Sequence, residues 1–176
     1  GLSFAVDNLA GEGILRGVHL VGDVMVDALL FNRDLAMQQS GILDRLSLSD
    51  HPYLVVTIHR PANTDSKRNM MQILTSLAGT GMPVVFPVHP RTRKFLQEFG
   101  LWDSLPEPFI VTEPLGYPDM IRLMAGARKI LTDSGGIQKE AYILGIPCIT
   151  LRDNTEWVET VEEGWNVLAG ADEERI

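Results

Sequence analysis

Tyr53-Leu-Val-Val-Thr-Ile58 is an unbroken run of apolar and β-branched residues, the pattern of a strand that is covered on both faces. A polar loop over residues 59–66 follows, and apolar residues then recur at helical spacing to about Gly79. The same order returns at once, because Pro83-Val-Val-Phe-Pro-Val88 leads through a second loop into helical spacing over residues 92–99. Strands that alternate with helices in this way predict a parallel sheet with helices on both of its faces.

The alternation extends in both directions along the chain. Further strands are predicted at residues 18–21, 109–111, 129–131 and 147–151, and further helices at residues 24–37, 119–127 and 137–144. A chain of 176 residues with 45% apolar content is long enough for one such core and too short for two. We therefore predict a single α/β domain over residues 1–176, built as a Rossmann-like doubly wound parallel sheet.

Composition excludes several classes of function. The net charge of −8 argues against binding to nucleic acid, which needs clustered Lys and Arg. Apolar runs fall well short of the ~20 residues that cross a bilayer, so we expect no membrane segment. Cys148, the single cysteine, is interpreted as a buried small hydrophobe, and a chain without internal disulfides suits the reducing cytoplasm. Because the chain begins with Gly1 and shows no signal-peptide pattern, we interpret its start as a position inside a longer protein.

Ser134, Gly135 and Gly136 follow a predicted strand and open a predicted helix, and ligands of doubly wound sheets bind at such carboxyl ends of strands. The glycines allow close approach of the backbone, Ser134 adds a hydroxyl, and the first helical turn offers free N–H groups with partial positive charge. This pattern indicates an anion site. The alternative is an ordinary capped helix with Asp133 or Ser134 as its N-cap.

Histidine and arginine stand together after two successive strands, as His59-Arg60 and as His89-Pro-Arg91. A guanidinium beside an imidazole can stabilise a departing diphosphate, or the imidazole can donate a proton to it. One such pair could be solvated loop residues, but its repetition at neighbouring strand ends favours function. The four histidines are scattered, without a Cys pair or a His-x₃-His spacing, so no metal site is predicted.

Two more charged residues are predicted at this edge of the sheet. Glu140 lies about one and a half turns into the helix after the double glycine and could reach a ribose; a solvated helix carboxylate is the alternative. Arg152 follows the last predicted strand, while Thr155 could cap the next helix with Glu156 near its start.

Five segments are informative together: Thr57-Ile-His-Arg-Pro-Ala-Asn63, Pro87-Val-His-Pro90, Thr132-Asp-Ser-Gly-Gly-Ile-Gln-Lys-Glu-Ala141, Leu144-Gly-Ile-Pro147 and Leu151-Arg-Asp-Asn-Thr-Glu156. In this order they resemble one enzyme family, the non-hydrolysing UDP-N-acetylglucosamine 2-epimerases. The resemblance implies a two-domain fold of the glycosyltransferase-B type, with the active site between two Rossmann-like halves, of which this chain is similar to the second. It also implies a homodimer and a reaction that removes the C2 proton of UDP-N-acetylglucosamine, expels UDP and adds it back to give UDP-N-acetylmannosamine, without a metal or redox cofactor.

The resemblance implies roles for particular residues. His59 and His89 would face the diphosphate or the reacting sugar as the catalytic pair. The remaining residues would bind UDP or substrate: Arg60 and Asn63, Ser134, Gly135 and Gly136 at the phosphates, Glu140 at the ribose, and Arg152 on the sugar side.

The sequence departs from the family pattern at three positions. Ala62 and Lys139 stand where an acidic residue is usual, and Met120 stands where some members have a Phe. The acidic residues that the family uses for proton transfer at C2 belong to the first half, which is absent from this sequence. Three alternatives stay open: a glycosyltransferase of the same architecture, a hydrolysing 2-epimerase that releases free N-acetylmannosamine, and an inactive nucleotide-sugar-binding module.

Overall fold

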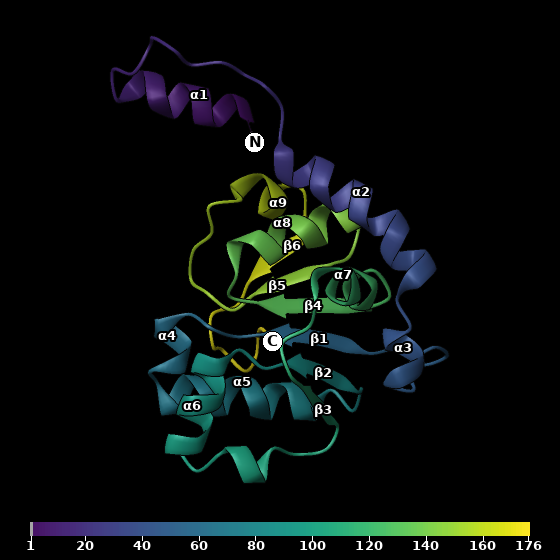
Figure 1. Ribbon diagram of the computed structural model, residues 1–176. Coiled ribbons are helices and arrows are strands. Elements are labelled where there is room, and N and C mark those ends of the chain that lie inside the picture. The colour runs from purple at the N-terminus through teal and green to yellow at the C-terminus, as the bar shows by residue number, and fades with distance from the viewer. Residues whose placement is uncertain (1) are drawn as a thin grey trace.

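The described part of the chain contains one six-stranded parallel sheet. The computed structural model describes residues 2–176, with side chains from residue 5 onward. The strands are β1 (Leu54–Thr57), β2 (Val84–Pro87), β3 (Phe109–Thr112), β4 (Lys129–Thr132), β5 (Cys148–Thr150) and β6 (Asn166–Leu168). Their spatial order is β3-β2-β1-β4-β5-β6, so the chain builds outward from β1, returns to its other side, and builds outward again (Figure 1). The predicted Rossmann-like doubly wound sheet is thereby confirmed.

Helices pack on both faces of this sheet. The helices of the described residues are α1 (Leu2–Gly11), α2 (Val24–Gln39), α3 (Ile42–Arg45), α4 (Pro61–Thr64), α5 (Lys67–Gly79), α6 (Pro90–Glu98), α7 (Tyr117–Ala125), α8 (Gly135–Leu144) and α9 (Val158–Glu162), with a 3₁₀ turn η1 (Trp102–Ser104). One apolar cluster joins α5 and α6 to one face, and a second joins α3, α7 and α8 to the other. The two clusters alternate along the strands: Val56 belongs to the first and its neighbour Val55 to the second, and both are fully buried. Burial on both faces explains the unbroken apolar run of β1.

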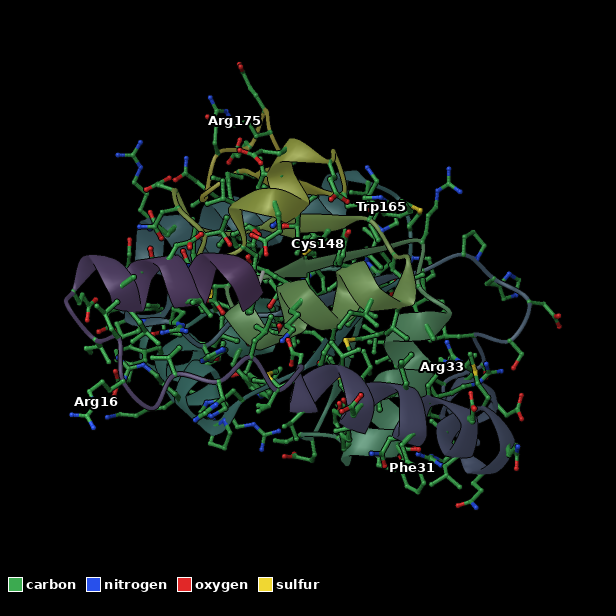
Figure 2. All side chains as sticks on the ribbon, turned by 90° about the horizontal axis from the view of Figure 1, so that it is seen from above. Arg16, Phe31, Arg33, Cys148, Trp165 and Arg175 are labelled. Carbon is green, nitrogen blue, oxygen red and sulfur yellow. The ribbon has the colours of Figure 1, made fainter. Side chains whose placement is uncertain are left out.

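α2 forms an additional layer outside α7 and α8. Its buried residues Leu29 and Ala36 pack with Ile121 of α7 and with the end of α8. The opposite side of α2 is open, and Phe31 points away from the protein there with 71% of its surface exposed (Figure 2). α1 lies apart from the sheet and is joined to α2 by residues 12–23 (Figure 1). Among the described residues, no helix combines the length and apolar character that crossing a bilayer requires.

The structure corrects several predicted elements. The strand predicted at residues 18–21 is wrong: the segment has no regular structure, and Val21 is 84% exposed, because no neighbouring strand pairs with it in the described residues. The loop predicted at residues 59–66 contains the short helix α4, whose first residue is Pro61, a position where the missing N–H of proline is not needed. β6 and α3 were not predicted. Three helices, α6, α7 and α8, begin two residues earlier than expected.

Candidate functional site

The site is built around Asp133, the residue that follows β4. Its carboxylate is fully buried and lies between the ends of β1 and β4, where the chain changes direction across the sheet. It accepts hydrogen bonds from the backbone N–H of His59 (3.0 Å), the backbone N–H of Arg60 (2.9 Å) and Nδ2 of Asn63 (3.1 Å). Sequence reasoning considered Asp133 only as a helix cap. In the structure it instead fixes the loop after β1, and this role was missed because its partners are 70 to 74 residues away.

Asn63, a residue of α4, also helps to fix the loop after β1. The residue is 3% exposed, and its Nδ2 donates both to Asp133 and to the backbone carbonyl of Leu151, at 2.9 Å. The side-chain amide thereby ties together the loops that follow β1, β4 and β5. This arrangement makes Asn63 a positioning residue, while the neighbouring Arg60 side chain is exposed at the edge.

His59 stands half-buried beside Asp133, with Nε2 at 3.7 Å from Oδ1. Burial lowers the pKa of His59, the negative charge of Asp133 opposes this, and the nearby Arg60 and His89 lower the pKa further. The imidazole is therefore biased toward its neutral form at neutral pH. It can still donate a hydrogen bond to an anion through its protonated nitrogen.

The ring of His89 lies 5.8 Å from the ring of His59, measured between centroids, so the two predicted histidines meet at one place. Nδ1 of His89 accepts the backbone N–H of Arg91 at 3.1 Å and caps α6. A nitrogen that accepts carries no proton, so the proton of neutral His89 lies on Nε2, which is left as a donor. Arg91 points elsewhere: it bonds Thr64 and Asp65 and thereby joins α6 to α4.

The first turn of α8 completes the edge. Ser134 is the N-cap residue, but within the described structure no side chain caps this helix with a hydrogen bond. Gly135 is buried, and Gly136 has room for a side chain, since a Cβ there would come no closer than 3.9 Å to Met25 or Ser134. The free N–H groups of this turn are the strongest feature of the edge for binding an anion.

The loop after β5 folds over this turn. Trp157 Nε1 donates to the carbonyl of Gly135 at 2.7 Å, and Thr155 Oγ1 donates to Gln138 of α8 at 2.6 Å. Arg152 bonds Glu156 at 2.9 Å. The predicted capping role of Thr155 is wrong, because α9 begins at Val158 with Trp157 in the N-cap position.

Glu140 lies further along α8, and it is mostly covered. The phenol of Tyr117 donates to Glu140 Oε1 at 2.9 Å. Burial raises the pKa of Glu140, and the hydrogen bond from Tyr117 opposes the rise. The bond holds the carboxylate in place at the junction of α7 and α8, and Tyr117 is a site residue that sequence reasoning did not include.

Lys139, one of the departures from the family pattern, has a structural explanation. It forms an ion pair with Asp23, the N-cap of α2, and its ammonium lies 4.9 Å from the centre of the Trp157 ring. Both charged side chains are mostly covered, at 11% and 20% exposure. A positive charge at this position therefore anchors the start of α2 to α8.

Most of the predicted site residues thus lie along one edge of the sheet, while Glu140 lies further along α8 and contacts Tyr117 instead. Contacts link His59, His89 and Asn63 around Asp133, and Arg152 reaches Gly135 through Glu156. No group of three or more His, Cys, Asp or Glu side chains suited to a metal ion occurs within the described residues.

Known proteins of one family resemble this chain over almost its whole length. The family model of UDP-N-acetylglucosamine 2-epimerase matches residues 3–176. A UDP-N-acetylglucosamine 2-epimerase homolog of Methanococcus maripaludis is 48% identical over 172 residues, covering 96% of this chain and 48% of the relative. A UDP-2,3-diacetamido-2,3-dideoxy-D-glucuronate 2-epimerase of Pseudomonas aeruginosa is 41% identical, covering 98% of this chain and 48% of that protein.

The solved structures agree. The crystal structure of Methanocaldococcus jannaschii UDP-GlcNAc 2-epimerase in complex with UDP-GlcNAc and UDP has a TM-score of 0.90 and 39% identity, covering 99% of this chain and 50% of that chain. This chain spans about half the length of the curated relatives that it matches. With the family model matched from residue 3 to the last residue, the chain belongs to the UDP-N-acetylglucosamine 2-epimerase family.

Proposed function

We propose that this chain is the UDP-binding, C-terminal half of an enzyme that interconverts UDP-N-acetylglucosamine and UDP-N-acetylmannosamine. One observation carries the proposal: His59, His89, Arg60 and the first turn of α8, which no side chain caps, all lie at the carboxyl edge around Asp133. Hydrogen-bond donors in a preorganised site are what a diphosphate leaving group needs. The structure of a relative in complex with UDP-GlcNAc and UDP supports this assignment.

The reaction proceeds by elimination and re-addition. A base removes the proton from C2 while the bond from C1 to the UDP oxygen breaks, which leaves a C1–C2 double bond and free UDP. UDP then attacks C1 again as a proton is added to the opposite face of C2. Negative charge grows on the diphosphate as the C1–O bond breaks, so groups that stabilise UDP in that state raise the rate rather than only the affinity.

The described side chains divide into three functions. His89, with its Nε2–H, and His59, in its neutral form, donate to the diphosphate, and Arg60 supplies a permanent positive charge. Ser134, Gly135 and Gly136 bind the phosphates through the α8 turn. Glu140 binds the ribose, and Arg152 faces the sugar.

The companion half supplies what these groups cannot. A neutral imidazole beside a diphosphate is suited to donating to oxygen, and proton transfer at C2 needs a carboxylate or another base on each face of the sugar. We assign those groups to the N-terminal half of a two-domain, cytoplasmic, homodimeric enzyme. The UDP portion of the substrate is common to the names of these relatives, whereas the sugar substituents differ: the name of a 41% identical relative specifies a 2,3-diacetamido-glucuronate.

The decisive experiment compares the chain alone with the chain plus its companion half. Each sample is incubated with UDP-N-acetylglucosamine in D₂O, and C2 is followed by proton NMR. We expect deuterium at C2 and UDP-N-acetylmannosamine only when both halves are present. Deuterium entering C2 with the 176-residue chain alone would place the base within it, and release of free sugar with UDP would indicate hydrolysis instead.

UDP binding by this chain is tested separately by calorimetry. Gly136→Val places a branched side chain in the α8 turn, where a Cβ comes no closer than 3.9 Å to another residue, and should weaken binding by about tenfold or more, a loss of at least ~1.4 kcal/mol. Gly79→Val is the matched control, because Gly79 ends α5 and a Cβ there meets nothing within 4 Å. Equal UDP affinity in the two folded variants would contradict the placement of the phosphates.

A further inference from the structure

The carboxylate of Glu156 lies directly against the first residue of α8. A Cβ built on Gly135 would come within 2.0 Å of Glu156 Oε1, so the carboxylate fills the space that a side chain at this position would need. The same turn carries the partial positive charge of free N–H groups, and an anion there is favoured. The sequence interpretation of Glu156 as a residue near a helix start does not explain this position.

Two anchors hold the backbone on either side of Glu156. Thr155 is bonded to Gln138 in the first turns of α8, and Trp157 is bonded to the carbonyl of Gly135. The carboxylate between them is therefore placed over the helix by its neighbours. Its remaining oxygen accepts from Nη1 of Arg152, four residues earlier.

The Glu156 side chain can leave this position without moving its anchors. About half of it is exposed, at 47%, so rotation about its own bonds carries the carboxylate into solvent. Such a rotation also releases the guanidinium of Arg152, whose side chain is 22% exposed and whose other contact is Asn154. One movement thus clears the space beside Gly135 and frees the Arg152 cation next to it.

We propose that Glu156 is a built-in anion that competes with the diphosphate for the first turn of α8, and that it sets which anions bind there. The inference rests on the proposed function, since it requires the α8 turn to bind phosphate. A ligand displaces Glu156 from the turn only if its contacts contribute more binding free energy than those of the single carboxylate. A diphosphate does so through His59, His89 and the released Arg152, whereas a single inorganic phosphate ion makes fewer of these contacts.

The test is the affinity of the 176-residue chain for UDP and for inorganic phosphate, measured by calorimetry. Glu156→Gln keeps the size of the side chain and removes its charge. A carboxylate at a helix N-terminus contributes about 0.3 to 2 kcal/mol, so UDP should bind roughly 2- to 30-fold more tightly to this variant, and phosphate should gain by at least the same factor. Glu162→Gln is the matched control: it removes the same charge from an exposed position in α9 and should change either affinity by less than about twofold.

The outcomes distinguish failure of this inference from failure of the proposed function on which it rests. If Glu156→Gln binds UDP with the affinity of the wild type, or more weakly, Glu156 does not compete and the inference is overturned, while UDP binding by the wild type leaves the proposed function intact. If folded wild-type chain and both folded variants all fail to bind UDP, the proposed function itself fails. Folding of each variant is verified by circular dichroism and by its urea unfolding curve.

Discussion

Replacing Asp133 with Asn tests whether the site depends on one buried carboxylate. The wild-type carboxylate accepts from three donors, the N–H groups of His59 and Arg60 and Nδ2 of Asn63. An amide presents one oxygen, which can face Arg60 and Asn63, and its NH₂ group then faces the N–H of His59. The same oxygen still accepts from the His59 N–H, 3.1 Å from the Oδ2 position, but the new NH₂ group is buried against that N–H without an acceptor, at a cost of about 1 to 3 kcal/mol, and two charge-assisted bonds become neutral ones at a cost of about 1 kcal/mol each.

Relief from burying a charge offsets part of this cost. We expect a net loss of roughly 2 to 4 kcal/mol in the free energy of unfolding, measured by urea denaturation. For a chain of this length, a loss of ~3 kcal/mol lowers the melting temperature by about 6 to 12 °C. Asp50→Asn, at an exposed turn, is the matched control and should change stability by less than about 0.5 kcal/mol. If Asp133→Asn and Asp50→Asn were equally stable, Asp133 would not hold the loop after β1, and the account of the site would have to be abandoned.

Two further predictions concern His59 and Lys139. Burial lowers the pKa of His59, so between that lowered value and about 6.5 the unfolded chain binds more protons than the folded chain, and stability falls with decreasing pH. The free energy of unfolding of the wild type relative to His59→Asn should therefore decrease between about pH 7.5 and pH 5. A constant difference would refute the assigned direction of the pKa shift. Lys139→Met removes the partner of Asp23 and should cost about 1 kcal/mol of stability, a difference that shrinks between about 0.05 and 0.5 M NaCl. Lys94→Met, at an exposed ion pair with Glu98, is the control. An equal loss of stability in both variants would mean that the ion pair with Asp23 stabilises the protein no more than an exposed pair does.

The sheet was predictable because its central strands carry their signal locally. β1 and β2 are buried on both faces, and only a continuous apolar run satisfies that environment. The errors in strand prediction arise where pairing with a neighbouring strand, rather than the local sequence, determines whether a strand forms. Residues 18–21 have the composition of a strand but lie exposed, while β6 is a strand of three residues that begins with Asn166 and exists because β5 pairs with it.

The site was predictable to the level of which loops form it. The rule that ligands bind at the carboxyl ends of strands selected the loops containing His59, His89 and Ser134, and the structure places them together. The contacts within the site were not predictable. Asp133 and Tyr117 act on residues 74 and 23 positions away, and periodicity carries no information on such pairs.

The strand order has a consequence for how the protein is made. β1, β2 and β3 are adjacent in sequence and in space, so they can pair as soon as the ribosome has released them. The loop after β1 must wait, because the carboxylate that accepts its N–H groups is synthesised 74 residues later. Until Asp133 has been synthesised, the backbone N–H groups of His59 and Arg60 lack the carboxylate that accepts their hydrogen bonds in the folded protein. The site is therefore assembled late in folding, and a nascent chain stalled before β4 would have its first three strands and yet lack the carboxylate that fixes the loop after β1.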